Sequence, residues 1–237
     1  MRVNVGCSGW FYWHWKDRFY PSNVPQSKWF KYYTTKFNTV ELNSTFYHFP
    51  KISTAKNWYK QSPKNFIYTL KVNRVITHIK KFKATSRLVK DFYKVGDELK
   101  EKIGCFLFQL PPSLKFNKKK LDEIIDQLDL KRRNVLEFRH DSWFTPEVYE
   151  ILRKNKIIFY IVSSPSLPED FVKTTEEIYV RFHGRGGWYS SNYSDDELKE
   201  WAKKIKKSKA EQVWAYFNND FNANATRNAL TLKKLLS

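Results

Sequence analysis

Five short apolar runs in this sequence each end in polar and charged residues of the kinds that carry out chemistry. The five run ends are Thr39–Asn43, Thr69–Asn73, Leu136–His140, Val180–Gly184 and Tyr216–Asp220. Because successive side chains of a strand point to opposite faces, Glu137 and Arg139 face away from Leu136 and Phe138. Charge that faces the middle of a sheet is costly to bury unless it is paired or used. Its repetition at the downstream end of strand after strand is how an α/β barrel presents an active site.

The residue types at these ends are suited to proton transfer on an anionic substrate. Glu41 and Glu137 are the candidate bases, because neighbouring cations favour an ionised carboxylate. His183 is the candidate acid, since imidazole titrates near neutrality. The polar residues expected to bind the substrate and its anionic group are Lys71, Gln109, Arg139, His140, Arg181, Asn218 and Asn219. The structural alternative is a buried ion-pair network that fills the end of the barrel.

A glycine-rich stretch follows the fourth run. Its members, Gly184, Arg185, Gly186 and Gly187, form a possible phosphate loop. Loops after the last two strands of such barrels often bind phosphate through backbone N–H groups and a helix N-terminus. Three nearby glycines are also compatible with a simple flexible turn, which is the alternative.

An aromatic segment lies near the N-terminus, with Trp10, Tyr12 and Trp15 among five aromatic residues in six positions. Such rings could form a lid that stacks on bases or sugar rings, helped by the nearby Lys16 and Arg18. The favoured interpretation is a hydrophobic plug folded over the end of the barrel, from which only the outer rings reach a ligand.

Eight strand-like runs alternate with segments of helical periodicity. The runs lie near residues 2–8, 38–43, 66–72, 103–109, 133–139, 156–162, 177–183 and 212–218. Strands that alternate with helices require a mostly parallel sheet, and eight repeats predict a single (β/α)8 barrel domain of the TIM type over residues 1–237. The alternative is an open doubly wound sheet, but no glycine fingerprint for dinucleotide binding follows the first of the eight runs.

Local signals locate two helix starts and one irregularity. Ser194 with Glu197 has the spacing of a capping box. Thr145 before Pro146 is typical of an N-cap followed by proline in the first helical turn. The connection Ser163–Pro168 is broken by prolines, so the barrel is expected to be irregular after the sixth strand, with a short or absent helix.

The composition is strongly basic, with a formal net charge of +19. Such an excess attracts polyanions, nucleic acid above all, although a solvated lysine-rich surface explains most of it. No apolar run is long enough to span a membrane. Two cysteines make neither a disulfide framework nor a zinc site, and a cytoplasmic location is expected.

No metal and no cofactor are predicted. A multi-metal site needs a dense set of histidines and carboxylates, and the chain has five histidines. Lys71, Arg139 and Arg181 occupy other strand ends, where their charges would repel a divalent cluster. A single metal held by the two candidate carboxylates and His183 is the less favoured alternative.

Several motifs also resemble, in their order, those of a known family. They are Gly6–Trp10, Phe19–Pro21, Thr39–Tyr47, Phe108–Pro112, Glu137–His140 and Phe217–Asn219. The chain resembles the DUF72 (YecE-like) family over nearly its whole length, which implies a TIM-type barrel and no assigned activity. Cys7 stands where relatives commonly carry threonine, which argues against a nucleophilic cysteine. Ser163 stands where many relatives carry aspartate, which puts any role for that carboxylate in doubt.

Three functions are compatible with these patterns. The primary hypothesis is a metal-independent acid–base enzyme acting on a small anionic substrate, a sugar or a phosphorylated metabolite, at the C-terminal end of the barrel. The second is a nucleic-acid-binding protein, such as a nuclease of the endonuclease IV type or a repair factor, favoured by the net charge and the basic segment Lys80–Lys83. The third is a non-catalytic ligand-binding barrel. Fold alone does not choose among them.

Overall fold

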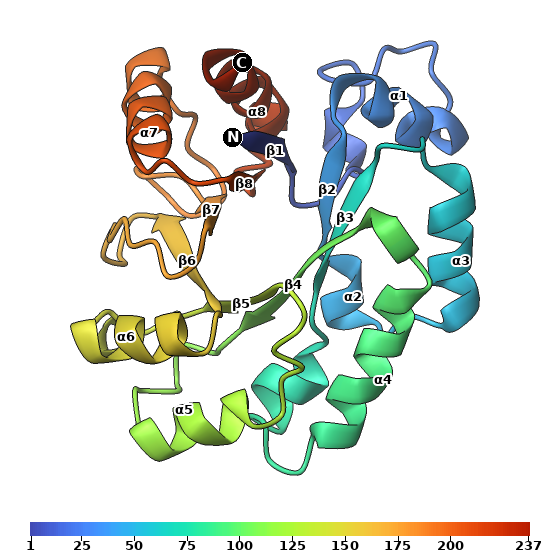
Figure 1. Ribbon diagram of the computed structural model, residues 1–237. Coiled ribbons are helices and arrows are strands. Elements are labelled where there is room, and N and C mark those ends of the chain that lie inside the picture. Colours follow the sequence, from blue (N-terminus) through green and yellow to red (C-terminus); the bar gives the residue numbers. More distant parts are fainter. The chain divides into compact units, whose positions relative to one another are not determined.

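The computed structural model describes all 237 residues. Its strands are β1 (Arg2–Cys7), β2 (Thr39–Leu42), β3 (Ile67–Lys71), β4 (Ile103–Gln109), β5 (Asn134–Glu137), β6 (Ile158–Ser163), β7 (Glu177–Phe182) and β8 (Gln212–Phe217) (Figure 1). Each lies within a residue or two of an apolar run in the sequence, so the eight predicted strands are confirmed.

Helices follow most of the strands. They are α1 (Trp29–Lys36), α2 (Ser44–Tyr47), α3 (Ile52–Gln61), α4 (Ser86–Asp97), α5 (Lys118–Ile125), α6 (Pro146–Lys154), α7 (Asp195–Lys207) and α8 (Asn224–Leu236). The capping box of Ser194 and Glu197 is present at the start of α7, and the Thr145 side chain caps α6. No helix separates β6 from β7, which confirms the predicted irregularity. None of the helices has the length and apolarity that a membrane span requires.

The strands form one sheet in the order β1-β8-β7-β6-β5-β4-β3-β2. The ladders between β1 and β8, β3 and β4, β4 and β5, β5 and β6, and β7 and β8 are all parallel. Parallel strands in sequential order, joined by helical crossovers everywhere except between β6 and β7, give the predicted α/β fold of the TIM-barrel type. Because the strands are parallel, the polar residues at the end of each run lie at the carboxyl ends of the strands, which share one edge of the sheet.

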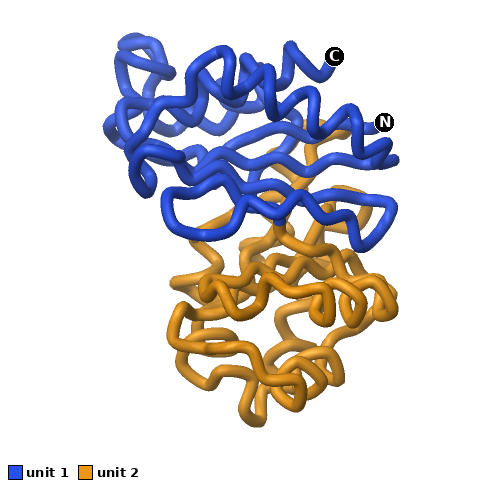
Figure 2. The backbone as a smooth tube through the Cα atoms, turned by 90° about the vertical axis from the view of Figure 1, so that its left-hand side faces the viewer, with its two compact units in different colours: residues 1–41, 161–237 blue, residues 42–160 orange.

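The chain is divided into two compact units (Figure 2). Unit 1 contains residues 1–41 and 161–237, and unit 2 contains residues 42–160. Unit 1 carries β1, β7 and β8, whereas unit 2 carries β3, β4 and β5. The single-domain organisation expected from the sequence stays a prediction.

In unit 1, helix α8 packs against β1 and β8, and α7 lies beside α8 (Figure 1). The inner stripe of α7, which includes Leu198, Trp201 and Ile205, is buried. The lysines on its other face, such as Lys203 and Lys206, are exposed, as helical periodicity predicts.

Tyr33 of α1 joins β1 to β2 inside unit 1. Its buried hydroxyl accepts a hydrogen bond from the Cys7 N–H at 2.9 Å and donates one to the Thr39 carbonyl at 3.0 Å. The two strands approach closely at Gly6, where an added Cβ would lie 2.4 Å from the Thr39 carbonyl oxygen. One side chain thus satisfies two buried backbone groups at this contact between the first two strands.

The core of unit 2 is rich in aromatic contacts on the outer face of its strands. Phe138, just after β5, stacks on Trp143 with ring centroids 4.6 Å apart. On β4, Phe106 meets Tyr93 of α4 edge to face, with 4.8 Å between ring centroids. Because alternate residues of these strands face outward into this packing, Gln109 and Glu137 face the other side.

Candidate functional site

At the carboxyl ends of the unit 1 strands, Arg181 of β7 and Glu41 of β2 form an ion pair. Arg181 Nη2 lies 2.7 Å from Glu41 Oε1, and both side chains are fully buried. The Tyr179 hydroxyl donates a hydrogen bond to Glu41 Oε2. Burial, and next the charge of Glu41, raise the pKa of Tyr179 well above its ordinary value, so this hydroxyl stays protonated as a donor. Arg181 and Tyr179 thus each contact one oxygen of the Glu41 carboxylate, and the buried positive and negative charges compensate each other.

His183 follows β7 and is also fully buried. Its Nδ1 lies 3.2 Å from the Asn218 side-chain nitrogen. The rings of Trp188 and Tyr189 lie against the imidazole, with centroids 5.2 and 5.5 Å away. Asn219 has a framework contact instead, because its amide donates to the Ser191 carbonyl at 2.9 Å and to Asn228 Oδ1 at 2.8 Å.

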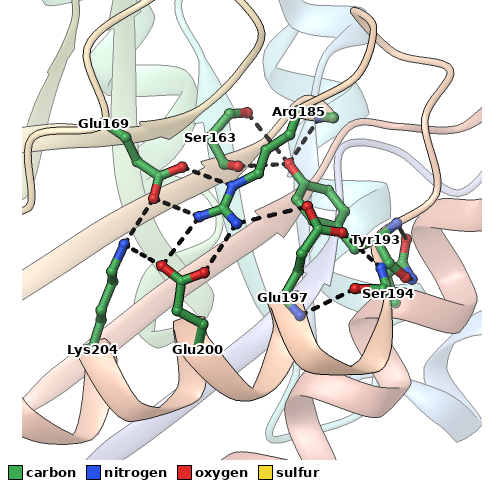
Figure 3. Close-up of polar contacts among 10 residues, drawn as sticks. Ser163, Glu169, Arg185, Tyr193, Ser194, Glu197, Glu200 and Lys204 are labelled. Carbon is green, nitrogen blue, oxygen red and sulfur yellow. Dashed lines mark hydrogen bonds and ion pairs between the residues drawn. The ribbon is translucent and has the colours of Figure 1, made fainter.

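The glycine-rich stretch after β7 is anchored by Arg185. Its guanidinium group is paired with Glu169 at 2.7 Å, Glu200 at 3.1 Å and Glu197 at 3.7 Å, and Lys204 contacts two of the same carboxylates (Figure 3). These pairs raise the pKa of Arg185 further above its ordinary value, with Glu169 the main cause. A phosphate bound by Arg185 would have to displace carboxylates that already surround it.

Gly184 of the same stretch is required by local packing. Its φ is +98°, and an added Cβ would lie 2.3 Å from Ser191 Oγ. The Gly184 N–H donates to the Tyr193 hydroxyl at 2.9 Å, and that hydroxyl donates to Ser163 Oγ, also at 2.9 Å (Figure 3). Backbone geometry therefore accounts for this glycine without a ligand.

The aromatic segment after β1 is packed against unit 1. Trp15 is fully buried, Tyr12 donates to the Ser8 carbonyl at 2.6 Å, and Trp10 contacts Phe30 with 4.9 Å between ring centroids. The exposed rings of the segment are Phe11 and Trp13. The inner rings of the segment thus pack within unit 1, while the plug favoured from the sequence and a lid role for Trp10, Tyr12 and Trp15 both stay predictions.

In unit 2, three consecutive strands end in polar residues that face the same side of the sheet. Lys71, Gln109 and Glu137 are the last residues of β3, β4 and β5. Gln109 is in register with Glu137, and its side-chain amide donates to Glu137 Oε1 at 2.7 Å. Arg139 Nε donates to the same oxygen. Glu137 is fully buried, and only 9% of the Arg139 side chain is exposed.

Lys71 and His78 lie against the same aromatic ring in unit 2. The Lys71 ammonium group is 4.2 Å from the centroid of Phe46, and the imidazole of His78 meets that ring edge to face at 4.9 Å. His78 lies in a π-helical turn, Val75–Ile79. At the start of this turn the Asn73 side chain accepts a hydrogen bond from the Val75 N–H at 3.0 Å. Such turns occur frequently at functional sites.

Electrostatics join these residues into one group. Burial, and next the charges of Lys71, Arg139 and Lys81, lower the pKa of His78 to about 4 against the opposing effect of Glu137. His78 is therefore neutral near pH 7, in a field set by three cations and one carboxylate. We call Lys71, His78, Gln109, Glu137 and Arg139 the β3–β5 cluster.

His140 has a local structural contact. Its Nδ1 accepts a hydrogen bond from the Ser142 N–H at 3.2 Å and so caps the short turn Asp141–Trp143. The Asp141 carboxylate lies 2.8 Å from the same nitrogen. The expected role of His140 in anion binding stays a prediction.

The structure contains no group of three or more histidine, cysteine, aspartate or glutamate side chains that could hold a metal ion. The expectation of chemistry without metal or cofactor stays a prediction.

A family model described as "Protein of unknown function DUF72" matches residues 4–237. The chain belongs to the DUF72 family. The chain is 26% identical to the UPF0759 protein YunF of Bacillus subtilis, over 99% of this chain and 94% of that protein. It is 29% identical to the UPF0759 protein YecE of Escherichia coli, over 47% of this chain and 42% of that protein. The resemblance seen in the sequence motifs is confirmed.

Solved DUF72 structures share the fold. A family member from Thermotoga maritima superposes with a TM-score of 0.91 at 31% identity, covering 100% of this chain and 99% of that one. A member from Enterococcus faecalis gives a TM-score of 0.85 at 20% identity, over 99% and 95% of the two chains. These matches support the TIM-type fold, and the family's description supplies no activity.

Two residues that contribute to these sites, Tyr179 and His78, were not among the candidates chosen from the sequence. Tyr179 could have been found, because strand alternation places it on the same face as Arg181. His78 is recognisable only as a histidine able to approach the strand ends. Its turn lies beyond the third strand, where neither strand nor helix periodicity applies, so its contacts with Phe46 and its lowered pKa depend on packing.

The pKa of His78 predicts a loss of stability in mild acid. The unfolded chain binds a proton on this imidazole near pH 6.5, whereas the folded chain binds it only near pH 4. The unfolded state thus binds more protons in that window, and the free energy of unfolding should fall by about 1–2 kcal/mol as pH decreases through it. Urea unfolding at several pH values should show this dependence in the wild type and a weaker one in His78→Gln. The exposed His48→Gln is the control, and an unchanged slope in His78→Gln would contradict the assignment.

Proposed function

We propose that this DUF72 protein is a metal-independent acid–base enzyme that binds a small anionic substrate at the β3–β5 cluster. The observation that carries the proposal is that buried Lys71, the largely covered Arg139 and its partner Glu137 all act electrostatically on one neutral histidine, His78. Such a combination of charge partners and a strongly shifted pKa at strand ends of a TIM-type fold is typical of functional sites.

Each member of the cluster has a proposed role. Lys71 and Arg139 bind the anionic group, Arg139 being able to offer its planar fork of donors. Glu137 is the base, paired with Arg139 and oriented by the amide of Gln109. The Glu41–Arg181 pair of unit 1 is assigned to the framework, because each fully buried charge already has the other as its partner.

His78 couples substrate binding to proton transfer in this proposal. Burial is the main cause of the lowered pKa of His78, and an anion bound between Lys71 and Arg139 would offset the second cause, which is their positive charge. The pKa of His78 would then rise part of the way toward its ordinary value of 6.5, so the protonated fraction of this histidine in mild acid increases when the substrate is present. NMR titration of the His78 imidazole with and without inorganic phosphate would detect this rise.

Calorimetric titration with inorganic phosphate tests the anion site directly. Lys71→Met and Arg139→Gln should each weaken phosphate binding by about tenfold or more, since hydrogen bonds to charged groups are among the stronger ones. Arg87→Gln is the matched control, because the Arg87 side chain is 95% exposed in the same unit. Equal phosphate affinity in all three variants and the wild type would remove the anion site from the cluster.

The same variants separate a metabolite anion from nucleic acid. Labelled single-stranded DNA should bind weakly, lose binding as salt increases, and respond equally to Arg139→Gln and Arg87→Gln if the charge of +19 acts only as a diffuse surface. Tight binding near physiological salt that Arg139→Gln alone weakens would instead make nucleic acid the ligand of the cluster.

We also propose a cytoplasmic location. Cys7 and Cys105 are both buried and form no disulfide, which suits a reducing compartment. Burial raises the pKa of the Cys7 thiol far above its ordinary value, so this cysteine is not a nucleophile in the proposed chemistry.

A further inference from the structure

Unit 1 contains a cavity of about 520 Å³ between the loops that follow β1, β7 and β8. Three aromatic residues, Trp188, Tyr189 and Phe221, line it together with the polar side chains of His14, Arg18 and Asp220. Its volume is in the range of small-molecule sites, which commonly combine aromatic side chains with a few polar groups. None of these residues belongs to the β3–β5 cluster.

The walls of this unit 1 cavity are held in place by hydrogen bonds between the loops. His14 Nε2 and Trp15 Nε1 both contact the Asp220 carbonyl, at 2.9 and 3.1 Å, which joins the β1 loop to the β8 loop. The Phe221 N–H donates to the Tyr189 carbonyl at 3.3 Å, which joins the β8 loop to the β7 loop. The cavity is therefore preformed, which lowers the entropic cost of binding.

Two of the lining residues have unusual backbone conformations. Tyr189 has a φ of 64° and Asn222 a φ of 53°, both in the left-handed region, and Ala223 follows with 59°. For residues other than glycine these angles cost free energy and persist only where the surroundings impose them. They turn the β7 and β8 loops so that Tyr189 and Phe221 line the same cavity.

The polar groups favour an uncharged ligand. The Asp220 carboxylate lines the cavity, with its Oδ2 3.3 Å from His14 Nε2. Burial raises the pKa of Asp220 above its ordinary value, and a phosphate or carboxylate ligand beside it would add like-charge repulsion. The carboxylate accepts hydrogen bonds, Arg18 donates them, and the rings offer flat apolar faces. A sugar ring supplies hydroxyls that both donate and accept, and a C–H face that packs on aromatic rings.

We propose that the unit 1 cavity binds an uncharged saccharide ring, packed against Tyr189 and Phe221 and hydrogen-bonded to Asp220 and Arg18. This site is separate from the proposed anion site and does not rest on it.

Ligand-observed NMR with methyl glycosides of glucose, galactose, mannose and N-acetylglucosamine tests the assignment, followed by calorimetry for any that bind. Asp220→Asn keeps the shape of the side chain but removes its charge. Phe221→Ala removes a ring that is 58% exposed, so the fold should tolerate it. Each variant should weaken glycoside binding by about tenfold. Asp196→Asn and Tyr47→Ala, which change an exposed carboxylate and an exposed ring outside the cavity, should leave it unchanged, and melting temperatures check that all variants are folded.

Binding of at least one glycoside with this pattern of losses supports the saccharide site. The proposal would be overturned if none of the glycosides bound, or if Asp220→Asn and Phe221→Ala bound them as tightly as the wild type does. Guanosine and inorganic phosphate are the competing probes, and displacement of the glycoside by guanosine at lower concentration would assign the cavity to a nucleobase instead. Phosphate affinity in Lys71→Met is measured separately, so failure of this site leaves the anion site untouched.

Discussion

Arg181→Met should lower the free energy of unfolding by about 3–5 kcal/mol, because it leaves the Glu41 carboxylate buried without its cation. Both side chains are fully buried, and the pair distance is 2.7 Å. Methionine fills much of the same volume without any charge, so the loss reports the broken pair more than a cavity. Chemical denaturation with urea, followed by circular dichroism, measures the difference.

The controls for Arg181→Met use one exposed arginine and one double variant. Arg87→Met should change stability little, since its side chain is 95% exposed. Adding Glu41→Gln to Arg181→Met should restore part of the loss, because glutamine keeps an acceptor for the Tyr179 hydroxyl without a buried charge. Unchanged stability in Arg181→Met together with lost phosphate binding would mean that Arg181 binds substrate, as expected from the sequence, and does not act as framework.

The strands and their polar ends were predictable because both depend on local pattern. Alternation of apolar and polar residues has a period of two in a strand, so the sequence alone assigns Glu137 and Arg139 to one face. The same reasoning located Lys71 and Gln109 at strand ends. Parallel topology then brings such ends to one edge of the sheet, as the register of Gln109 with Glu137 shows.

The partners of those residues were not predictable in the same way. Glu41 and Arg181 are 140 positions apart, and nothing in either run says that their charges neutralise each other. Arg185 illustrates the same limit, since Glu169 and Glu200 lie in segments whose approach to the glycine-rich stretch depends on tertiary packing. Composition and spacing indicate which chemistry a side chain could perform, whereas pairing decides whether it is available to a ligand.

The Tyr33 hydroxyl bridges β1 and β2, so Tyr33→Phe should lower the free energy of unfolding by about 2–4 kcal/mol. The variant keeps the ring but leaves the Cys7 N–H and the Thr39 carbonyl without the partner that lies 2.9 and 3.0 Å away. Both groups are buried, and Gly6 shows that the strands already approach closely at this point. Hydrogen exchange of the Cys7 amide should accelerate in step with the loss of global stability, measured by urea unfolding.

Tyr32→Phe is the matched control for this contact, because Tyr32 precedes Tyr33 on α1 and is only half-buried. Its loss of one hydroxyl should cost little, since water can replace a partner there. If Tyr33→Phe were no more destabilising than Tyr32→Phe, the two strands would not depend on the tyrosine bridge, and close packing at Gly6 alone would have to hold them. A large difference between the two variants would show that the Tyr33 side chain, which comes from a helix, takes the place of ladder hydrogen bonds between the strands. The need for a tyrosine at this position would then be structural and separate from any activity.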